Sequence, residues 1–557
     1  MGATRLQVMT HRSQIFEIAD TYTNEIVKFS PLAATGLGVA GYDHLLDDFS
    51  LEHSDTVAAY KKSVVASLTG MEPIDDADRI AKEVMLERLE SELHLHESHE
   101  SQILFGVLWS PVSSVRQIFE LMPRDTAEDF SNIESRLLAV DTAFDTWKSC
   151  LSKVADAGKV PAQRQAKGVS EQLKVHAKGN YTSFVERIDP DNAYPALRAA
   201  AQEAEAACLK LAAWFDDVYI GRCNPNDPVG KDRYQLWARY FTGANLNLLE
   251  TYEWGVQELA RINERMKRVA AQILPQAQTL AEVAEYLEHA EGYVIEGEDK
   301  LVAKLKDFTE KAIERLDGEI FDIDVRIRQC DARIAPAGSA AAPYYIGPSE
   351  DLKRPGTTWF PTLGRNSFSF WHIASTWYHE AVPGHHLQFA TVIINTDRLS
   401  RFQRNDGWNS GYGEGWALYA ERLMDELGGF EDPGYELGYL SAQALRAARV
   451  VVDIGMHLEL PNFYGGTWDA TSAVKLLREQ ALLQEDNAVS EVERYLGLPG
   501  QAISYKVGER YWLEAREAAK LRLGDSFDIK KFHTFALALG PMALDSLKAE
   551  IGLWNGQ

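Results

Sequence analysis

The chain is poor in cysteine. It has four in 557 residues: Cys150, Cys208, Cys223 and Cys330. None belongs to a Cys-x-x-Cys pair, so the spacing argues against a disulfide framework and against a cysteine-ligated zinc site. We therefore expect free thiols, as in a reducing cytoplasm. Any metal ion would have to be bound by histidine and carboxylate ligands.

Long apolar runs are also missing. No stretch approaches the roughly 18 consecutive apolar residues that a membrane-spanning helix needs. The first residues, Met1–Arg12, turn polar at once and lack the apolar run of a secretory signal. A weak match to a myristoylation signal fails at Leu6, where that signal has Ser or Thr. The sequence thus predicts a soluble cytoplasmic protein that does not contact a membrane.

Basic residues are scarce relative to acidic ones. The 57 Lys and Arg residues stand against 82 Asp and Glu, which gives a net charge of −25. Nucleic acids and anionic membranes are polyanions, so a chain with this charge is not expected to bind either of them. The composition leaves the oligomeric state open.

What the chain does contain is a long series of helical patterns, and these predict a mostly α fold. Apolar residues recur near the helical period, or helix formers dominate, in four stretches: Ile80–Leu95, Phe130–Val154, Ala199–Trp214 and Leu248–Val269. Breaks that contain proline separate such stretches. We expect helix almost throughout from Thr10 to about Ala340.

The composition changes near residue 340. Ala332–Ala342 is made mostly of small residues and is typical of a linker, and Pro343–Pro348 is typical of a brief edge strand. We therefore predict an N-terminal helical region over 1–340 and a second region over 341–557. The two are expected to form one compact unit.

The most informative stretch is Trp377–Gln388, which places three of the fourteen histidines close to Glu380. A His-Glu pair followed by Gly-His resembles the zinc-binding helix of metallopeptidases, where two histidines bind metal and the glutamate is the general base. That motif has its second histidine four residues after the first. Here His385 and His386 follow His379 by six and seven residues.

Pro383 and Gly384 suggest how the longer spacing can still bind a metal ion. Pro383 has no N–H to donate to the carbonyl of His379, so the helix must break there. A bulge or loop at this point would absorb the two extra residues. We favour His385 as the second ligand because it follows Gly384. His386 would then support the ligands or contact the substrate.

A catalytic zinc ion also needs a third protein ligand and one position open to water. Glu414 begins an amphipathic helical pattern between two glycines, 29 residues after His385, which suits a second helix packed on the first. We predict Glu414 as the third ligand and Glu421 as a carboxylate that supports the ligands. The alternative for both is a solvated helix face.

Two further features allow two interpretations each. Arg446, Arg449, Asp453 and His457 share one face of an apolar helical segment. They form either a partly buried ion-pair ladder or a set from which an arginine or His457 holds a substrate carbonyl or carboxylate. Tyr505, in a Gly- and Pro-marked loop, is either a packed tyrosine or a hydrogen-bond donor to an oxyanion.

Ser91–Glu100 contains a second histidine cluster: His94, His96 and His99. Residues two apart face away from each other on a helix, and glutamates flank the run. We expect a solvated helix face here rather than a metal site.

Four segments resemble the signature blocks of a bacterial domain-of-unknown-function family, number 885: His379–Gln388, Glu414–Glu421, Arg449–His457 and Pro499–Gly508. Phe532-His533 and Gly540–Asp545 fit the same family. The resemblance is strong over about residues 343–550 and looser over the N-terminal half. Leu458–Asp469 departs from the family pattern.

That family is itself similar to helical zinc peptidases with a deep cleft, such as carboxypeptidase Taq, thimet oligopeptidase and angiotensin-converting enzyme. The resemblance implies a large helical zincin-like fold with a small β-sheet near the metal site. It implies a catalytic region over 341–557, with the N-terminal helices covering the cleft. It also implies one zinc ion bound by His379, His385 and Glu414, with Glu380 as the general base.

The motifs together with this resemblance predict a zinc-dependent metallopeptidase, and the resemblance implies that its substrates are short peptides. Glu380 would take a proton from the metal-activated water, and Tyr505, His386 or His457 would donate to the oxyanion. Two alternatives remain. One is a non-catalytic metal- or peptide-binding helical scaffold, and the other is a zinc amidohydrolase that acts on a non-peptide amide. The motifs do not distinguish amino-, carboxy- and endopeptidase action.

Overall fold

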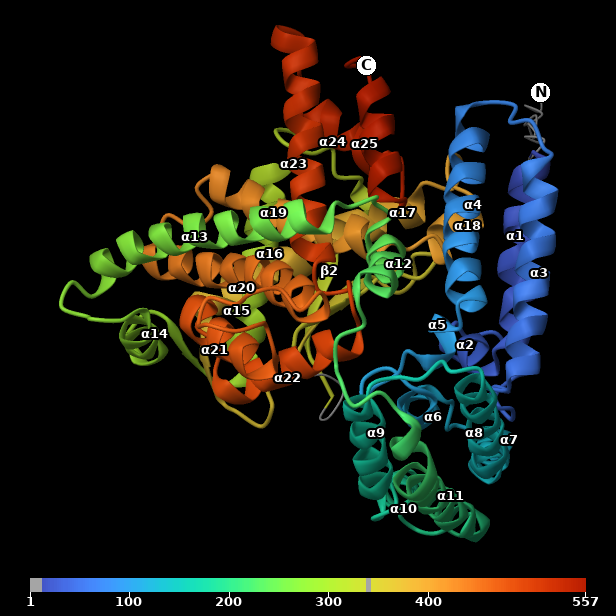
Figure 1. Ribbon diagram of the computed structural model, residues 1–557. Helices are drawn as coiled ribbons and strands as arrows, with labels where there is room; N and C mark the ends of the chain where they lie inside the picture. Colours follow the sequence, from blue (N-terminus) through green and yellow to red (C-terminus); the bar gives the residue numbers. More distant parts are fainter. Residues whose placement is uncertain (1–12, 337–341) are drawn as a thin grey trace.

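The computed structural model describes residues 13–336 and 342–557, and most of them are helical, as predicted (Figure 1). At the N-terminus, three long helices stand side by side, and short helices connect them to the next group. The helices at this end are α1 (Gln14–Ile26), α2 (Pro31–Gly36), α3 (Leu51–Thr69), α4 (Asp76–Glu97) and α5 (Glu100–Ile103). Helices α1 and α4 both pack against α18 (Arg401–Asn405), which belongs to the C-terminal half.

The second group of helices has a hydrophobic core of its own, which runs from Phe105 to Cys223 and includes Trp147, Phe215 and Tyr219. These helices lie below the N-terminal ones in Figure 1. They are α6 (Pro111–Leu121), α7 (Ala127–Leu138), α8 (Val140–Asp156), α9 (Gln163–His176), α10 (Asn180–Ile188) and α11 (Pro195–Trp214).

The remaining helices build the largest part of the molecule and share one extensive core with the N-terminal helices. Here α13 and α16 both pack along α20, and α19 packs along α23. The helices are α12 (Lys231–Thr242), α13 (Leu248–Ile273), α14 (Leu280–His289), α15 (Glu298–Leu316), α16 (Phe370–Glu380), α17 (His385–Ile394), α19 (Ser410–Glu426), α20 (Pro433–His457), α21 (Ala470–Ala481), α22 (Glu485–Gly497), α23 (Ser504–Leu523), α24 (Ile529–Ala538) and α25 (Leu544–Leu553).

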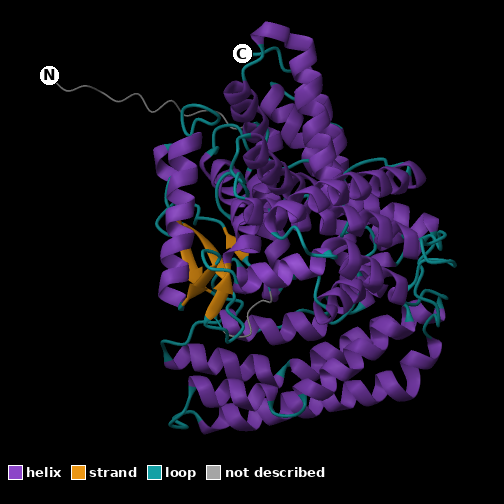
Figure 2. Cartoon of the chain, turned by 90° about the vertical axis from the view of Figure 1, so that its left-hand side faces the viewer, coloured by secondary structure: helices purple, strands orange, loops and turns teal. Residues whose placement is uncertain are grey.

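The described residues include five short strands, which gather at one side of the molecule (Figure 2). They are β1 (Val294–Glu296), β2 (Cys330–Ile334), β3 (Tyr344–Ile346), β4 (Gly356–Phe360) and β5 (Ser367–Ser369). In the three-stranded sheet, β4 is central, with β2 parallel and β3 antiparallel to it. Strand β3 is thus the predicted edge strand. Strands β1 and β5 form a separate antiparallel pair.

The four helical stretches expected from the sequence all form. Three fall within single helices, α4, α11 and α13, whereas Phe130–Val154 divides between α7 and α8. The linker expected at Ala332–Ala342 is wrong at its start, because Ala332–Ile334 pairs with β4 as part of β2. Residues 337–341 lie outside the described residues. So does the segment 1–12, on which the signal and myristoylation expectations rest.

Two further expectations concern cysteines and membranes. All four cysteines are free, as predicted, and three of them are buried. No helix in the described ranges is long and apolar enough to cross a membrane. The division into 1–340 and 341–557 stays a prediction.

Helices α19 and α23 cross at an unusually close distance because glycines face each other there. A methyl group built on Gly415 would lie 2.5 Å from the backbone of Gly508. A methyl group on Gly508 would lie 2.6 Å from the Cα atom of Gly415 and would overlap the carbonyl of Gly411. Backbone therefore meets backbone at this crossing, and no larger residue fits without separating the helices.

We expect Gly508→Ala to lower the free energy of unfolding by about 1–3 kcal/mol, because overpacked helices must move apart. Gly552→Ala is the matched control. Gly552 lies near the end of α25, and a methyl group there would meet nothing within 4 Å. The control should unfold at the same denaturant concentration as the wild type or at a slightly higher one. Denaturant unfolding of the three proteins tests this, and equal stability of both variants would contradict the close crossing.

Candidate metal centre

The end of α16 places His379 and Glu380 in the interior, where they are 3% and 8% exposed. The chain then makes a turn through the cis Val382–Pro383 peptide bond before α17 begins at His385. In this turn the N–H of Gly384 donates to the carbonyl of Tyr378 at 3.0 Å. A methyl group on Gly384 would overlap the carbonyl of His379. Only glycine therefore lets the chain turn this tightly against the end of α16.

A tryptophan on α19 holds the same turn through a hydrogen bond. The Nε1–H group of Trp416 donates to the carbonyl of Pro383 at 3.0 Å, and the Trp416 side chain is fully buried. The turn thus adds the two residues that lengthen the motif, and it brings His385 back toward His379. The ring centroids of the two histidines lie 4.8 Å apart, with their planes nearly perpendicular.

Helix α19 carries the third member of the group. Its first turn is capped by Asn409, whose side chain accepts from the N–H of Tyr412. Glu414 comes next on this helix, and its Oε2 lies 3.3 Å from Nε2 of His379 and 3.5 Å from Nε2 of His385. One ligand atom from each of the three residues lies within 4.8 Å of the other two. The structure thus brings together the three predicted ligands.

Glu421 supports this group from behind and is fully buried, so the alternative of a solvated face does not apply to it. The Nδ1–H group of His379 donates to Oε1 of Glu421 at 2.8 Å, and the hydroxyl of Ser375 donates to Oε2 at 2.5 Å. The bond from His379 fixes its ring and leaves its Nε2 facing Glu414. A carboxylate behind a histidine ligand is the usual arrangement in zinc sites.

The buried carboxylates control the charge of the group. Burial by itself would lower the pKa of His379, but the hydrogen bonds to Glu414 and Glu421 outweigh it and raise that pKa to about 9. Burial likewise opposes ionisation of Glu414, but its bonds to both histidines hold its pKa well below the usual range. The pocket therefore favours positive charge between these side chains, which suits a divalent cation.

Two imidazole nitrogens and one carboxylate oxygen form a donor set that fits zinc with one coordination position left for water. Glu380 lies beside this group. Burial raises the pKa of its carboxyl group, which forms no hydrogen bond with another described residue. A carboxylate of this kind is suited to accept a proton.

A cleft of about 610 Å³ opens on the group, and all of its lining residues lie between Ala342 and Tyr505. The ring of Tyr505 stacks on that of His379 at 6.3 Å between centroids. Burial and the charge of Glu414 raise the pKa of Tyr505, so its hydroxyl keeps its proton and can donate. The N-terminal helices contribute no lining residue within the described part of the chain, and their predicted covering role stays a prediction.

His386 is buried and does not line the cleft, so of its two predicted roles, supporting the ligands or contacting the substrate, the second is corrected. Its Nδ1 accepts from the hydroxyl of Tyr345 at 2.9 Å, and its Nε2–H donates to the carbonyl of Ile327 at 2.8 Å. Burial lowers its pKa to about 4, so it is neutral. His386 thereby ties α17 to β3 and to the short turn η4 (Val325–Ile327), and His385 is the histidine that faces Glu414.

The four polar residues predicted to share one face of α20 lie in two different environments. Arg446 and Arg449 line the cleft. Asp453 and His457 are fully buried and do not line the cleft, so the substrate contact considered for His457 is corrected, and the alternative of a buried polar group applies to both.

The partners of Asp453 and His457 are structural. Asp453 accepts from the hydroxyl of Tyr234 at 2.7 Å and from the N–H of Gly500 at 2.9 Å. His457 donates to the carbonyl of Tyr495 at 3.1 Å. These bonds join α20 to α12, to α22 and to the loop before α23.

Sequence reasoning missed three residues at the centre and in the cleft beside it: Ser375, Trp416 and Glu491, which lines the cleft and accepts from Arg449 at 2.7 Å. Ser375 precedes His379 by four residues and so shares its helix face, which is a signal that could have placed it near the carboxylate. Trp416 and Glu491 act through residues distant in sequence, and no local pattern indicates them.

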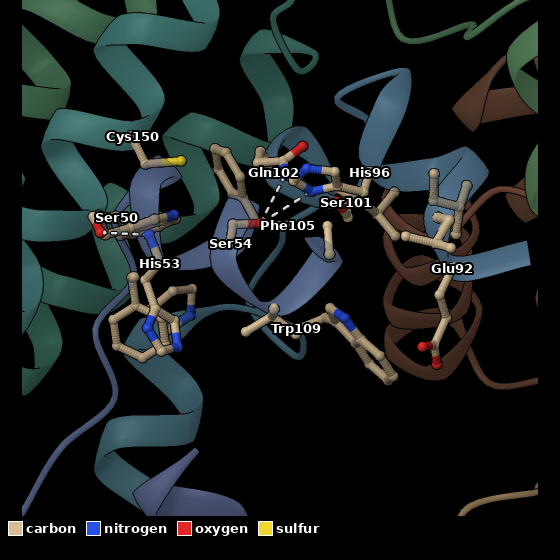
Figure 3. A pocket seen from close by; sticks show the side chains of 18 of the residues that line it. Ser50, His53, Ser54, Glu92, His96, Ser101, Gln102, Phe105, Trp109 and Cys150 are labelled. Carbon is tan, nitrogen blue, oxygen red and sulfur yellow. Dashed lines mark hydrogen bonds between the residues drawn. The ribbon is translucent and has the colours of Figure 1, made fainter. Parts of the chain in front are cut away.

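The second histidine cluster lies away from this centre, beside a separate pocket of about 430 Å³ (Figure 3). His96 points toward Ser54 and Gln102, with Nδ1 at 3.2 Å from the Ser54 hydroxyl and 2.9 Å from Nε2 of Gln102. Its Nε2 lies 3.1 Å from Asp55. Within the described ranges, the histidines of this cluster do not form a group of metal ligands.

A family model described as "Bacterial protein of unknown function" (DUF885) matches residues 31–551. The chain belongs to this family.

Two solved structures are similar over nearly their whole length. One is a predicted lipoprotein from Colwellia psychrerythraea, 22% identical, with a TM-score of 0.83, over 97% of this chain and 98% of that one. The other is a predicted lipoprotein of unknown function from Shewanella oneidensis, 16% identical, with a TM-score of 0.75, over 97% and 99%. At these identities the likeness shows the fold. No curated protein matches.

Separate substitutions of His385 and His386 test which of the two histidines is a zinc ligand. We expect His385→Gln to lose most of the zinc that the wild type retains, because one of three ligands is removed. We expect His386→Gln to retain the zinc, since the hydrogen-bond partners of His386 among the described residues are Tyr345 and Ile327. Metal analysis after dialysis into metal-free buffer measures the zinc content of both variants. Loss of zinc by the second variant alone would contradict this assignment.

Asp453→Asn tests whether the buried carboxyl group is structural. Burial outweighs the bonds from Tyr234 and Gly500 and raises the pKa of Asp453 to about 7. In the unfolded chain this pKa is about 3.9. The raised pKa means that stability is fully present below about pH 4 and falls as pH rises toward 7. The asparagine does not ionise, so the variant should lose less stability over this range.

The difference from the wild type should reach at most about 4 kcal/mol, at about 1.4 kcal/mol for each pKa unit. Denaturant unfolding across the pH range measures it. Asp299→Asn, at an exposed position in α15, is the control. If the curves of wild type and Asp453→Asn stay parallel from about pH 4 to 7, the raised pKa is wrong.

Proposed function

We propose that the protein is a zinc-dependent peptidase that acts on short peptides. The observation that carries the proposal is the convergence of His379, His385 and Glu414 next to Glu380 in the wall of a cleft. A cleft of about 610 Å³ is of the size that small ligands occupy. A short peptide would fit it better than a folded protein chain.

When bound, a zinc ion would lower the pKa of its water toward neutrality and polarise a substrate carbonyl. The chain supplies the remaining groups. Glu380 would accept the proton of the attacking water and return it to the leaving amine. The Tyr505 hydroxyl, which keeps its proton, would donate to the carbonyl oxygen as negative charge develops there. Glu421 and Ser375 would hold the His379 ring in place.

The partners and the cellular location are inferred from simpler observations. The net charge of −25 supports neither nucleic acid nor an anionic membrane as a partner. The four free thiols support the cytoplasm, where cysteines stay reduced. On these grounds we propose a cytoplasmic location and no nucleic-acid or membrane partner.

Glu380→Gln tests the catalytic role. The variant keeps the three ligands, so zinc content should be unchanged, whereas turnover should fall by about 10²–10⁴-fold because the base is lost. Hydrolysis of a short-peptide library, followed by mass spectrometry, measures turnover. The control is Glu253→Gln, at an exposed position on α13, which should behave as the wild type.

The outcomes separate the alternatives. Unchanged peptide hydrolysis by Glu380→Gln would contradict the assignment of the base. Bound zinc with no hydrolysis of any peptide by the wild type would favour a non-catalytic scaffold or an amidohydrolase that acts on non-peptide amides.

A further inference from the structure

One wall of the cleft carries an arginine with a guanidinium nitrogen left free. Arg449 is only 7% exposed, yet it lines the cleft. Its Nη2 donates to Glu491 at 2.7 Å, and its Nε donates to the Glu491 carboxylate and the Tyr495 hydroxyl at 3.1 Å each. Its Nη1 is buried and has no hydrogen-bond partner in the described part of the chain. A buried charged donor left unpaired calls for a ligand or another explanation.

The charges around this arginine leave an excess of positive charge. Glu491 is shared, because Arg494 also donates to it, at 2.9 Å, and so does the Tyr495 hydroxyl, at 2.5 Å. Arg446, one turn before Arg449, also lines the cleft. Its Nη1 donates to the carbonyl of Ala442 at 3.2 Å, and it forms no salt bridge with a carboxylate of the described residues.

Two guanidinium groups, those of Arg449 and Arg494, thus share one carboxylate, in a chain whose net charge is −25. The charge of Arg446 also reaches toward Glu380 and Glu421, where it favours the ionised carboxylates. The excess therefore remains at Arg449. An anionic group of the ligand would balance it.

The position of Arg449 relative to the metal ligands limits what that anion can be. The Arg449 guanidinium lies over the ring of Tyr505, with its carbon 4.7 Å from the ring centroid. The other neighbour of this ring is His379, at 6.3 Å. A single tyrosine ring therefore separates the free guanidinium edge from a predicted zinc ligand. A hydrogen bond at the guanidinium end and a metal–ligand distance at the other end take up part of this separation. One or two residues of extended peptide, at about 3.3–3.6 Å each, span the rest.

We propose that Arg449, assisted by Arg446, binds the C-terminal carboxylate of a peptide substrate, so that the protein is a carboxypeptidase that releases one or two residues. The free edge of a guanidinium group matches the two oxygens of a carboxylate, which a lysine does not. Asn487 and Ser490, both exposed on α22 and both lining the cleft, stand near Glu491 as further donors. This inference rests on the proposed peptidase function and names its substrate class.

The first experiment compares one peptide in two forms, with a free C-terminal carboxylate and with a C-terminal amide. For the wild-type zinc-loaded protein we expect kcat/KM to be at least about 10²-fold higher for the free acid, because the amide lacks the charge that Arg449 pairs with. Mass spectrometry should show loss of one or two C-terminal residues. Equal rates for the two forms, or release of N-terminal residues, would overturn the inference while leaving the peptidase proposal intact.

The second experiment substitutes the arginine. Arg449→Lys keeps the charge next to Glu491 but loses the fork, so kcat/KM for the free acid should fall by about tenfold or more, mainly through KM. The rate on the amide should change little. Arg268→Lys, at an exposed position on α13, is the matched control and should match the wild type. An equal fall for acid and amide would mean that Arg449 only supports the fold.

A binding measurement without turnover separates the two proposals. A dipeptide with a free carboxylate should raise the thermal midpoint of the metal-free wild type, whereas its amide should not, and Arg449→Lys should lose the effect. If this shift is seen but no peptide is hydrolysed, the peptidase proposal fails and the carboxylate site stands. If the dipeptide and its amide shift the wild type equally, the carboxylate site is wrong.

Discussion

One imidazole held between two carboxylates of a single helix is the interaction on which the centre depends. Glu414 and Glu421 lie on α19, and they contact opposite nitrogens of His379, which comes from α16. Neither carboxylate has full access to water, so removal of His379 would leave two buried carboxylates without the imidazole ring between them, which is far more costly than loss of a surface ion pair. The contacts that pack α16 on α19 are therefore the same contacts that set the geometry of the ligands.

The sequence was informative wherever a chemical requirement was local. Pro383 and Gly384 showed that the helix must break, and the break accounts for the unusual spacing of His379 and His385. Glu414 could be predicted from its position at the start of a helical pattern. In each case the deciding residues lie within one helix or one turn, where spacing determines direction.

The roles that could not be predicted depend on distant partners. His386 adjoins His385, yet its ring bonds to Tyr345 and Ile327, which lie 41 and 59 residues earlier. Asp453 bonds to Tyr234, 219 residues away. Helical periodicity places Arg449 and Asp453 on one face, but it does not show where that face leaves the cleft and enters the core. Only the packing of α12 and α22 on α20 decides this.

The glycine crossing of α19 and α23 has an evolutionary consequence. Because backbone meets backbone at Gly415 and Gly508, the spacing between Glu414 and Tyr505 does not depend on the size of any side chain between the helices. The wall built from α20 and α22 instead presents side chains such as Arg446, Asn487 and Ser490 to the cleft. Descendants of this chain could therefore change the ligand that the cleft admits while the groups at its centre keep their positions.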